Sequence, residues 1–298
     1  MEIFRFGFEA MSSACEIVMA CTAQKTAAQE LAANAIEEVA RIERKYSRYR
    51  KESIISRINA AAGKESVVCD AETLSLLHFA DTLFSTSGGL FDITAGVLRK
   101  GWDFSRKRLP EEDELLRLLP LIGWQDVERD KERIRLPVAG MEIDFGGFGK
   151  EYAADRAASM LHAKGVRHGY VNLAGDIRLI GPKPDDAPWV IGIQDPRQKD
   201  KTIASIPLHA GALATSGDYE RYFESDGKRY CHIIHPWTGY PVSFWQSVTV
   251  VAPLAVTAGS YSTIAMLKER EALAFLDDSA VGYLAVDSNG KIYHKECA

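Results

Sequence analysis

A series of short strand-like segments fills the second half of the chain, and it limits the folds open to this sequence. The predicted strands cover residues 169–173, 177–181, 188–194, 203–208, 211–215, 229–234 and 246–252. Polar loops that contain proline, Lys183–Pro188 and Asp195–Lys201, separate some of them. Apolar residues at helical spacing dominate the first half instead. Helices followed by many strands predict an α+β fold.

The remaining predicted elements complete one domain. Helices are expected at residues 23–47, 70–87, 111–119, 150–164 and 254–276. A first strand is expected at 14–20, a hairpin at 133–137 and 141–144, and final strands at 281–286 and 291–295. The sequence has no internal repeat and no convincing linker, so we predict a single α+β domain over residues 1–298.

Composition excludes several functional classes. With 46% hydrophobic and 26% charged residues, the chain has the balance of a soluble globular protein. The net charge is −5 and the basic residues are dispersed, so no nucleic-acid partner is expected. No apolar run approaches the roughly 18 residues that a membrane span needs. No export leader is recognisable at the start, which favours a cytoplasmic location.

The cysteines and histidines do not predict a soft-metal site. The five cysteines are scattered without a CxxC motif, which favours a reducing compartment: Cys15, Cys21, Cys69, Cys231 and Cys297. His232 and His235 are three apart at a predicted strand end, so they are expected to point in opposite directions. The other histidines have no partner at ligand spacing, and a zinc site is not expected.

The segment from Gly211 to Gly239 is the strongest candidate for a functional site. It contains the run Thr215-Ser216-Gly217-Asp218-Tyr219, followed by His232 in the sequence CHIIHPWTG. Two polar strand ends joined by a hairpin are a common way for a sheet to present a site.

A glycine-rich run, DFGGFGKEYAAD at residues 144–155, follows a predicted strand and opens a predicted helix. Free N–H groups at a helix start suit a pyrophosphate. The run lacks the Gly-Lys-Ser/Thr ending of a Walker A loop and the βαβ context of a Rossmann unit.

Three further motifs allow both a binding and a purely structural interpretation. Ser47 to Asn59 can hold a flavin edge or cap helices with its serines. The run GGLFDITAG from Gly88 can approach a flat cofactor or form an ordinary turn. The run NLAGDI from Asn172 can bind a ribose through Asp176 or form a bulge between strands.

Together these motifs resemble, in order, those of the ApbE family of FAD:protein FMN transferases. The run ATSGDY followed by HIIHPWTGYP is similar to that family's ATSGDY and HIIDPxTGxP, and the glycine-rich run to DxGGxAKGYAxD. The matches extend from Met11 to Thr263. The resemblance implies a T-fold-like arrangement of antiparallel sheets flanked by helices. It also implies Mg²⁺-dependent transfer of FMN from FAD to a threonine of an acceptor protein, with release of AMP.

The resemblance assigns expected roles to individual residues. His232 is the candidate general base, with Asp218 orienting it or the acceptor. The metal ligands are expected to be Thr263, the main chain of Gly147 and Phe148, and the position of Gly259. The expected FAD-binding residues are Ser47, Tyr49, Phe91, Asp92, Thr94, Gly146, Gly147, Lys150, Asp155, Asp176, Thr215, Ser216, Gly217 and Tyr219.

Several positions depart from the family patterns. Gly259 stands where that pattern has the Asp that binds Mg²⁺, in AGSYST at residues 258–263, and Thr263 is retained. Two alternatives therefore stay open: a non-catalytic FAD-binding protein and an FAD pyrophosphatase. A Gly259→Asp change is expected to restore the carboxylate without loss of stability. Asp92, Asp218 and His235 are the candidates considered to replace it. The other departures are Gly149, Glu151, Ala174 and His235.

Overall fold

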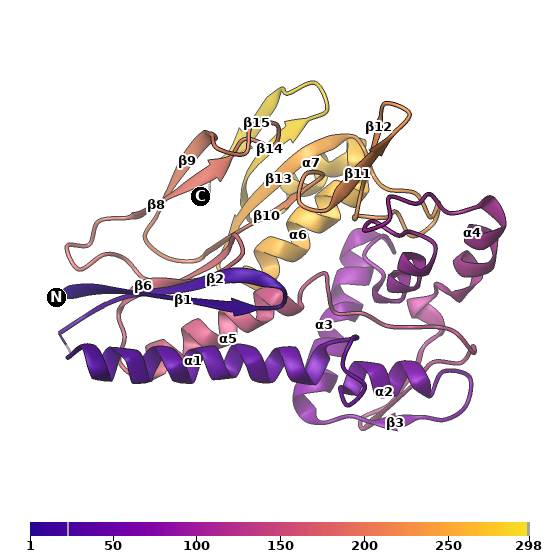
Figure 1. The fold of residues 1–298 in the computed structure, drawn as a ribbon, viewed down its shortest axis with the longest axis horizontal. Helices are drawn as coiled ribbons and strands as arrows, with labels where there is room; N and C mark the ends of the chain where they lie inside the picture. The colour runs from indigo at the N-terminus through magenta and orange to yellow at the C-terminus, as the bar shows by residue number, and fades with distance from the viewer. Residues whose placement is uncertain (23, 297–298) are drawn as a thin grey trace.

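A computed structural model describes residues 1–22 and 24–296 and is built around one antiparallel sheet of eight strands. The strand order is β1-β2-β6-β7-β10-β13-β14-β15 (Figure 1). Its strands are β1 (Glu2–Ala10), β2 (Ser13–Cys21), β6 (His168–Leu173), β7 (Asp176–Gly181), β10 (Ala212–Gly217), β13 (Trp245–Ala252), β14 (Gly282–Asp287) and β15 (Ile292–Lys295). The predicted combination of helices and antiparallel strands in an α+β fold is confirmed.

Smaller elements surround this sheet. The minor strands are β3 (Val67–Val68), β4 (Glu128–Arg129), β5 (Arg133–Arg135), β8 (Trp189–Gln194), β9 (Thr202–Leu208), β11 (Tyr222–Ser225) and β12 (Lys228–Cys231). The helices are α1 (Lys25–Tyr46), α2 (Ile54–Ala60), α3 (Ala71–Ser87), α4 (Glu112–Leu118), α5 (Gly149–Ala163), α6 (Ala255–Lys268) and α7 (Ala272–Asp278). Short 3-10 turns occupy Ile93–Lys100, Leu119–Leu121, Trp124–Asp126 and Glu269–Glu271.

The sheet buries side chains on both faces, which explains why several strands are apolar throughout. In β2, Ile17 and Met19 belong to the larger core, which also contains residues of α1, α5 and α6. Val18, between them, faces the opposite way into a smaller core with Trp189 and Leu208 of the β8–β9 hairpin. The period of two along a strand therefore fills two separate cores.

The segment before the glycine-rich run corrects one prediction. Residues 141–144 do not form the second strand of a hairpin with 133–137. Instead Asn59 of α2 clamps this segment, since its side chain donates to the Ile143 carbonyl at 3.0 Å and accepts from the Ile143 N–H at 2.7 Å. β5 pairs with β3 and β4. A side chain distant in sequence thus satisfies the backbone groups that a hairpin would have used.

Two other elements differ from what the sequence led us to expect. Strand β1 was not predicted, although it pairs with β2 along its whole length. The predicted helix at 254–276 is two helices, because the chain breaks at Glu269 with φ 46°. There the Glu269 carbonyl accepts a 2.6 Å hydrogen bond from the Trp245 indole N–H, which anchors the break to β13.

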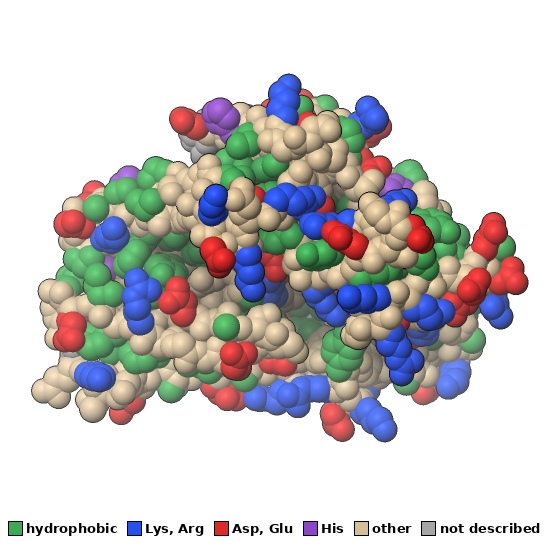
Figure 2. Space-filling model, turned by 45° about the horizontal axis from the view of Figure 1, so that its top comes forward, with side chains coloured by type: hydrophobic (Ala, Val, Ile, Leu, Met, Phe, Trp, Pro, Cys, Tyr) green, Lys and Arg blue, Asp and Glu red, His purple; other side chains and the backbone are tan. Residues whose placement is uncertain are grey.

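The structure bears on two expectations from the sequence, the absence of a membrane span and the state of the cysteines. Within residues 1–22 and 24–296, no helix is both long and apolar enough to cross a membrane. Cys15, Cys21, Cys69 and Cys231 are free thiols, and Cys297 lies outside the described residues. Acidic and basic side chains are interspersed on the face drawn in Figure 2.

Candidate functional site

The glycine-rich run forms the N-terminal end of α5, and Lys150 in its first turn faces β7. Lys150 Nζ lies 2.5 Å from Asp176 Oδ2, at the start of β7. Phe148 precedes the helix as a fully buried residue, and it makes no side-chain capping hydrogen bond. The N-terminal amides of α5 and the ammonium of Lys150 therefore provide positive charge beside the carboxylate of Asp176.

The electrostatics of Lys150 favour its charged form. Burial lowers the pKa of Lys150, but the negative charges of Asp176 and Glu151 outweigh that effect and raise it. Burial also raises the pKa of Asp176, which by itself would favour a neutral carboxyl. The raised pKa of Lys150 thus favours a charged ammonium, whereas the raised pKa of Asp176 favours a neutral carboxyl group. The ion pair prevails, because neutralising Asp176 would leave the ammonium without the counter-charge 2.5 Å away.

A cluster of hydroxyl groups lies where the end of β10 meets α6. Ser216 Oγ is 2.7 Å from Ser262 Oγ and 3.0 Å from Thr263 Oγ1. Ser262 Oγ also donates to the Gly259 carbonyl at 2.9 Å. Thr215 faces β13 instead, with its hydroxyl 2.8 Å from that of Thr249. The predicted residues Ser216 and Thr263 are therefore brought together, joined by Ser262, which sequence reasoning did not select.

Glu151 of α5 lies directly against Gly259 of α6. A Cβ atom at position 259 would lie 2.5 Å from Glu151 Oε1 and 2.8 Å from its Cδ. Such an approach is possible only because residue 259 has no side chain. The expectation that Gly259→Asp would keep its stability therefore does not take account of Glu151, because the buried Glu151 side chain would have to move to make room for the new side chain.

His232 follows β12 and is solvent-exposed. The pKa of His232 is lowered mainly because nearby protein atoms replace part of the water around the imidazole ring. The positive charges of Arg221 and Lys150 lower it further. Contact with water limits the size of this effect but not its direction. A lowered pKa keeps the imidazole neutral at pH 7, which is the form that can accept a proton.

Asp218 is connected to His232 through the hairpin that carries the histidine. Its carboxylate accepts two hydrogen bonds from Arg197, both 2.7 Å, and a longer one of 3.4 Å from Arg229 of β12. The His232 N–H donates to the Arg221 carbonyl at 2.9 Å. The described contacts of Asp218 therefore fix β12 rather than the imidazole ring.

Several predicted FAD-binding residues have structural partners. Asp92 Oδ1 accepts from the Thr94 N–H at 2.7 Å and from its hydroxyl at 2.5 Å. Asp155 accepts the Ala255 and Val256 amides, both at 2.9 Å, and so caps α6. These bonds account for the carboxylates of Asp92 and Asp155 within the fold itself.

Two aromatic residues predicted to contact flavin differ in exposure. Phe91 is buried and packs against Phe148, and its ring would lie 2.7 Å from a Cβ at Gly147. The Phe91 ring therefore packs directly against the glycine-rich loop at Gly147. Tyr49 is 75% exposed and stacks with the guanidinium of Arg48, while Ser47 ends α1.

The hydroxyls of Ser216, Ser262 and Thr263 and the Gly259 carbonyl form an oxygen-rich corner. Lys150 and the N-terminal amides of α5 are the groups in this structure suited to a phosphate-bearing ligand. This geometry agrees with the comparison to known proteins, because the sequence profile described as "ApbE family" matches residues 11–285. The chain belongs to the ApbE family.

Relatives and solved structures extend this assignment along most of the chain. An "FAD:protein FMN transferase" of Vibrio cholerae is 30% identical over 248 residues, which cover 80% of this chain and 74% of the relative. One from Treponema pallidum is 33% identical over 235 residues, which cover 72% and 64%.

Two crystal structures have the same fold. The ApbE protein of Thermotoga maritima superposes with a TM-score of 0.90 at 33% identity, covering 99% of this chain and 97% of that one. The apo flavinyl transferase ApbE of Pseudomonas stutzeri gives 0.88 at 26% identity, covering 99% and 95%. The helix-flanked antiparallel sheet implied by the ApbE resemblance is thus confirmed.

The ApbE-family site of this chain contains residues that sequence reasoning missed. Asp144, the first residue of the glycine-rich run, accepts from the Gly146 N–H at 3.0 Å and pairs with Arg48. The Asp144 N–H in turn donates to the Ile93 carbonyl at 2.9 Å. Asp144 therefore joins three of the motifs. Its position as the first residue of the glycine-rich run was the feature of the sequence that could have identified it as a site residue.

The oxygen-rich corner is chemically compatible with a hard cation. Glu151 Oε2 and Ser260 Oγ are buried without a hydrogen-bond partner. Glu151 lies against Gly259, whose carbonyl accepts a hydrogen bond from the Ser262 hydroxyl at 2.9 Å. No group of three or more His, Cys, Asp and Glu side chains suited to a metal ion occurs among the described residues. Mg²⁺ needs only one or two carboxylates when a substrate phosphate completes its shell.

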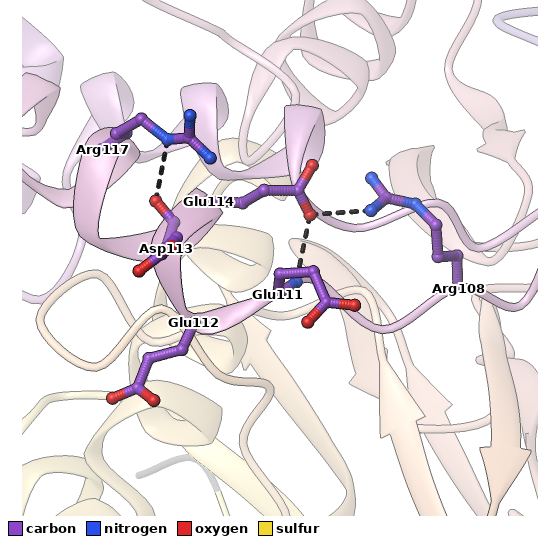
Figure 3. A pocket seen from close by; sticks show the side chains of 6 residues that line it. All are labelled: Arg108, Glu111, Glu112, Asp113, Glu114 and Arg117. Carbon is purple, nitrogen blue, oxygen red and sulfur yellow. Dashed lines mark hydrogen bonds and ion pairs between the residues drawn. The ribbon is translucent and has the colours of Figure 1, made fainter.

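A depression beside α4, distant in sequence from these motifs, is explained by local structure. It is lined by Arg108, Glu111, Glu112, Asp113, Glu114 and Arg117 (Figure 3). Glu114 accepts from Arg108 at 2.7 Å and from the Glu111 N–H at 3.0 Å, as in a capping box. This depression contains no predicted site residue.

Proposed function

We propose that this protein is an FAD:protein FMN transferase that moves the FMN part of FAD to a threonine hydroxyl of an acceptor protein. The observation that carries the proposal is the Lys150–Asp176 ion pair at the N-terminus of α5, since the charge of Lys150 also acts on His232. The hydroxyls of Ser216 and Thr263, from β10 and α6, supply the second part of the proposed site. Transfer of a phosphoryl group requires cationic, hydroxyl and basic groups close to the reacting phosphate, and these residues are proposed to provide them.

The bond changes balance without a further reactant. The threonine oxygen bonds to the phosphorus of the FMN half, the P–O bond to the AMP phosphate breaks, and AMP leaves. Neutral His232 accepts the threonine proton. Lys150 and the amides of the glycine-rich run bind the pyrophosphate oxygens and oppose their negative charge.

The oxygen-rich corner is proposed to bind Mg²⁺, with the Thr263 hydroxyl and the main chain near Gly147 and Phe148 among its ligands. Mg²⁺, when bound, would neutralise pyrophosphate charge. Asp218 holds β12 through Arg229, and His232 follows directly after that strand, so Asp218 is proposed to position His232 through the backbone of the hairpin. These residues therefore position the groups that react.

The proposal is tested by following both products of the reaction. The purified protein is incubated with FAD, MgCl₂ and an extract from cells in which its gene is deleted, so that acceptors lack flavin. AMP release with flavin attached to a threonine, seen by in-gel fluorescence and mass spectrometry, supports the transferase. AMP with only free FMN would indicate a pyrophosphatase, and bound but intact FAD would indicate a non-catalytic binding protein.

A further inference from the structure

Two departures from the ApbE sequence patterns meet in space. Glu151 stands where the pattern has Gly, and Gly259 stands where it has Asp. One lies on α5 and the other on α6, yet a Cβ at 259 would be only 2.5 Å from Glu151 Oε1. The carboxylate of Glu151 therefore fills the space into which an aspartate at 259 would project. The number of carboxylates at this corner is unchanged, and only their helix of origin differs.

Glu151 has an unmet bonding requirement. Its side chain belongs to a residue that is only 8% exposed, and its Oε2 atom is buried without a hydrogen-bond partner. A buried carboxylate oxygen without a partner is costly. Ser260 Oγ, next to Gly259 in the chain, is also buried and unpartnered. The unpartnered carboxylate oxygen of Glu151 at the α5–α6 contact therefore points to a group that it can bind.

The groups around this contact are hard oxygen ligands. Ser262 Oγ binds the Gly259 carbonyl at 2.9 Å and Ser216 Oγ at 2.7 Å, and Thr263 Oγ1 joins Ser216 at 3.0 Å. Hydroxyl and carbonyl oxygens supplemented by one carboxylate suit Mg²⁺, whose remaining positions are filled by water or phosphate. The carboxylate that lies beside Gly259 is that of Glu151.

We propose that Glu151 is the carboxylate ligand of the metal site in this protein and replaces the ligand that α6 does not provide at Gly259. The inference rests on the proposed function for the presence of a metal, and it names the residue that binds it. It also explains Gly259 itself, because any side chain there would displace the Glu151 carboxylate.

The other candidates are already engaged. Asp92 caps the turn at Thr94, and its second oxygen accepts from the Trp124 N–H at 3.1 Å. Asp218 is bound by Arg197. His235 Nδ1 accepts from the Trp237 N–H at 3.3 Å in the turn that follows.

The experiment measures metal binding directly, separately from turnover. Mn²⁺ serves as the probe, and free Mn²⁺ is counted by electron paramagnetic resonance for the wild type, Glu151→Gln, Gly259→Asp and the double variant Glu151→Gly/Gly259→Asp. Glu151→Gln is expected to weaken Mn²⁺ binding by at least about 10- to 100-fold, the loss seen even for outer-sphere partners of metals. Gly259→Asp alone is expected to lower the melting temperature, and the double variant is expected to regain Mn²⁺ binding.

Controls separate this inference from the proposed function. Glu220→Gln removes another carboxylate whose charge acts on Lys150, and it is expected to leave Mn²⁺ affinity within about two-fold because it does not face Gly259. Near-ultraviolet circular dichroism verifies folding of each variant. Unchanged Mn²⁺ affinity in folded Glu151→Gln overturns the inference even if the wild type transfers flavin. Mn²⁺ binding that depends on Glu151 in a protein without transferase activity supports the ligand and contradicts the function.

Discussion

Lys150 and Asp176 form a 2.5 Å ion pair that joins the first turn of α5 to the start of β7. The position of Asp176 is fixed by the pairing of β6 with β7, in which Asp176 lies opposite Leu173. Because the Asp176 residue is only 4% exposed, its carboxylate is a fixed support, and the more accessible Lys150 is free to bind a second anion. We therefore propose that Lys150 binds the phosphate and that Asp176 orients its ammonium group.

Replacing Lys150 with Met is expected to weaken FAD binding by about 10- to 100-fold. A charged hydrogen bond contributes about 1.5–3 kcal/mol, and each 1.4 kcal/mol is about a tenfold change. Binding is measured by quenching of flavin fluorescence. Lys131→Met, at an exposed turn, is the matched control and should bind FAD as the wild type does. Equal affinities for the two variants would remove Lys150 from the site.

Replacing His232 with Ala is expected to reduce flavin transfer by about 10²–10⁴, the usual contribution of a general base. FAD affinity should stay close to that of the wild type, because His232 is proposed to act on the acceptor hydroxyl. His235→Ala is the control, since His235 binds the backbone of its own turn and should have a milder effect. Transfer is followed as AMP release, and an unchanged rate in His232→Ala would exclude this histidine as the base.

The pH profile tests the state of His232. Its pKa is lowered in the folded protein, so the neutral base persists to lower pH than an ordinary histidine with a pKa of about 6.5. The acid limb of kcat/KM should accordingly lie below about pH 6.5. Arg221→Gln removes one positive charge that lowers this pKa, so the limb should move to higher pH.

A shift of that limb to lower pH in Arg221→Gln, or no shift, would show that another group controls the profile. Lys228→Gln removes a charge from the same hairpin that does not contribute to the lowering, and it serves as the control. FAD affinity is measured at each pH, so that weaker binding is not mistaken for loss of the base.

The sequence predicted what depends on neighbours along the chain and missed what depends on contacts between distant segments. The start of a helix in the glycine-rich run and the strand at the ATSGDY run were predicted correctly, because each depends on residues within a few positions of one another. Glu151 was noted only as a departure near the phosphates, because its contact with Gly259 exists only when α5 packs on α6.

Strand β1 was missed for a local reason. The turn between β1 and β2 places Met11 and Ser12 at φ 51° and 60°, where Asn or Gly is the usual signal. The hairpin at 133–137 and 141–144 was predicted wrongly for the opposite reason. Its alternating pattern was genuine, but Asn59 from a preceding helix took the backbone groups of Ile143. Pattern alone does not reveal which partner satisfies a backbone group.

The last prediction concerns Asp155, which caps α6 from α5 and forms an ion pair with Arg178 at 3.2 Å. Leu254, at the N-cap of α6, makes no side-chain capping bond of its own. Asp155→Ala should therefore cost at least about 1–2 kcal/mol of unfolding free energy, as the loss of a cap does. α6 carries Ser262 and Thr263 of the hydroxyl cluster, so its N-terminus also sets the geometry of the site.

Asp70→Ala provides the matched comparison, because Asp70 caps α3 through a 2.9 Å bond from the Thr73 N–H. Both variants should lose stability in urea unfolding, by about 1 kcal/mol or more. Only Asp155→Ala should also weaken FAD and Mn²⁺ binding, since α6 contributes hydroxyls to the site and α3 does not. If both variants bind FAD and Mn²⁺ as the wild type does, the cap supports the fold without shaping the site. If Asp155→Ala weakens FAD binding with no loss of stability, Asp155 contacts FAD itself, as the sequence motif predicted.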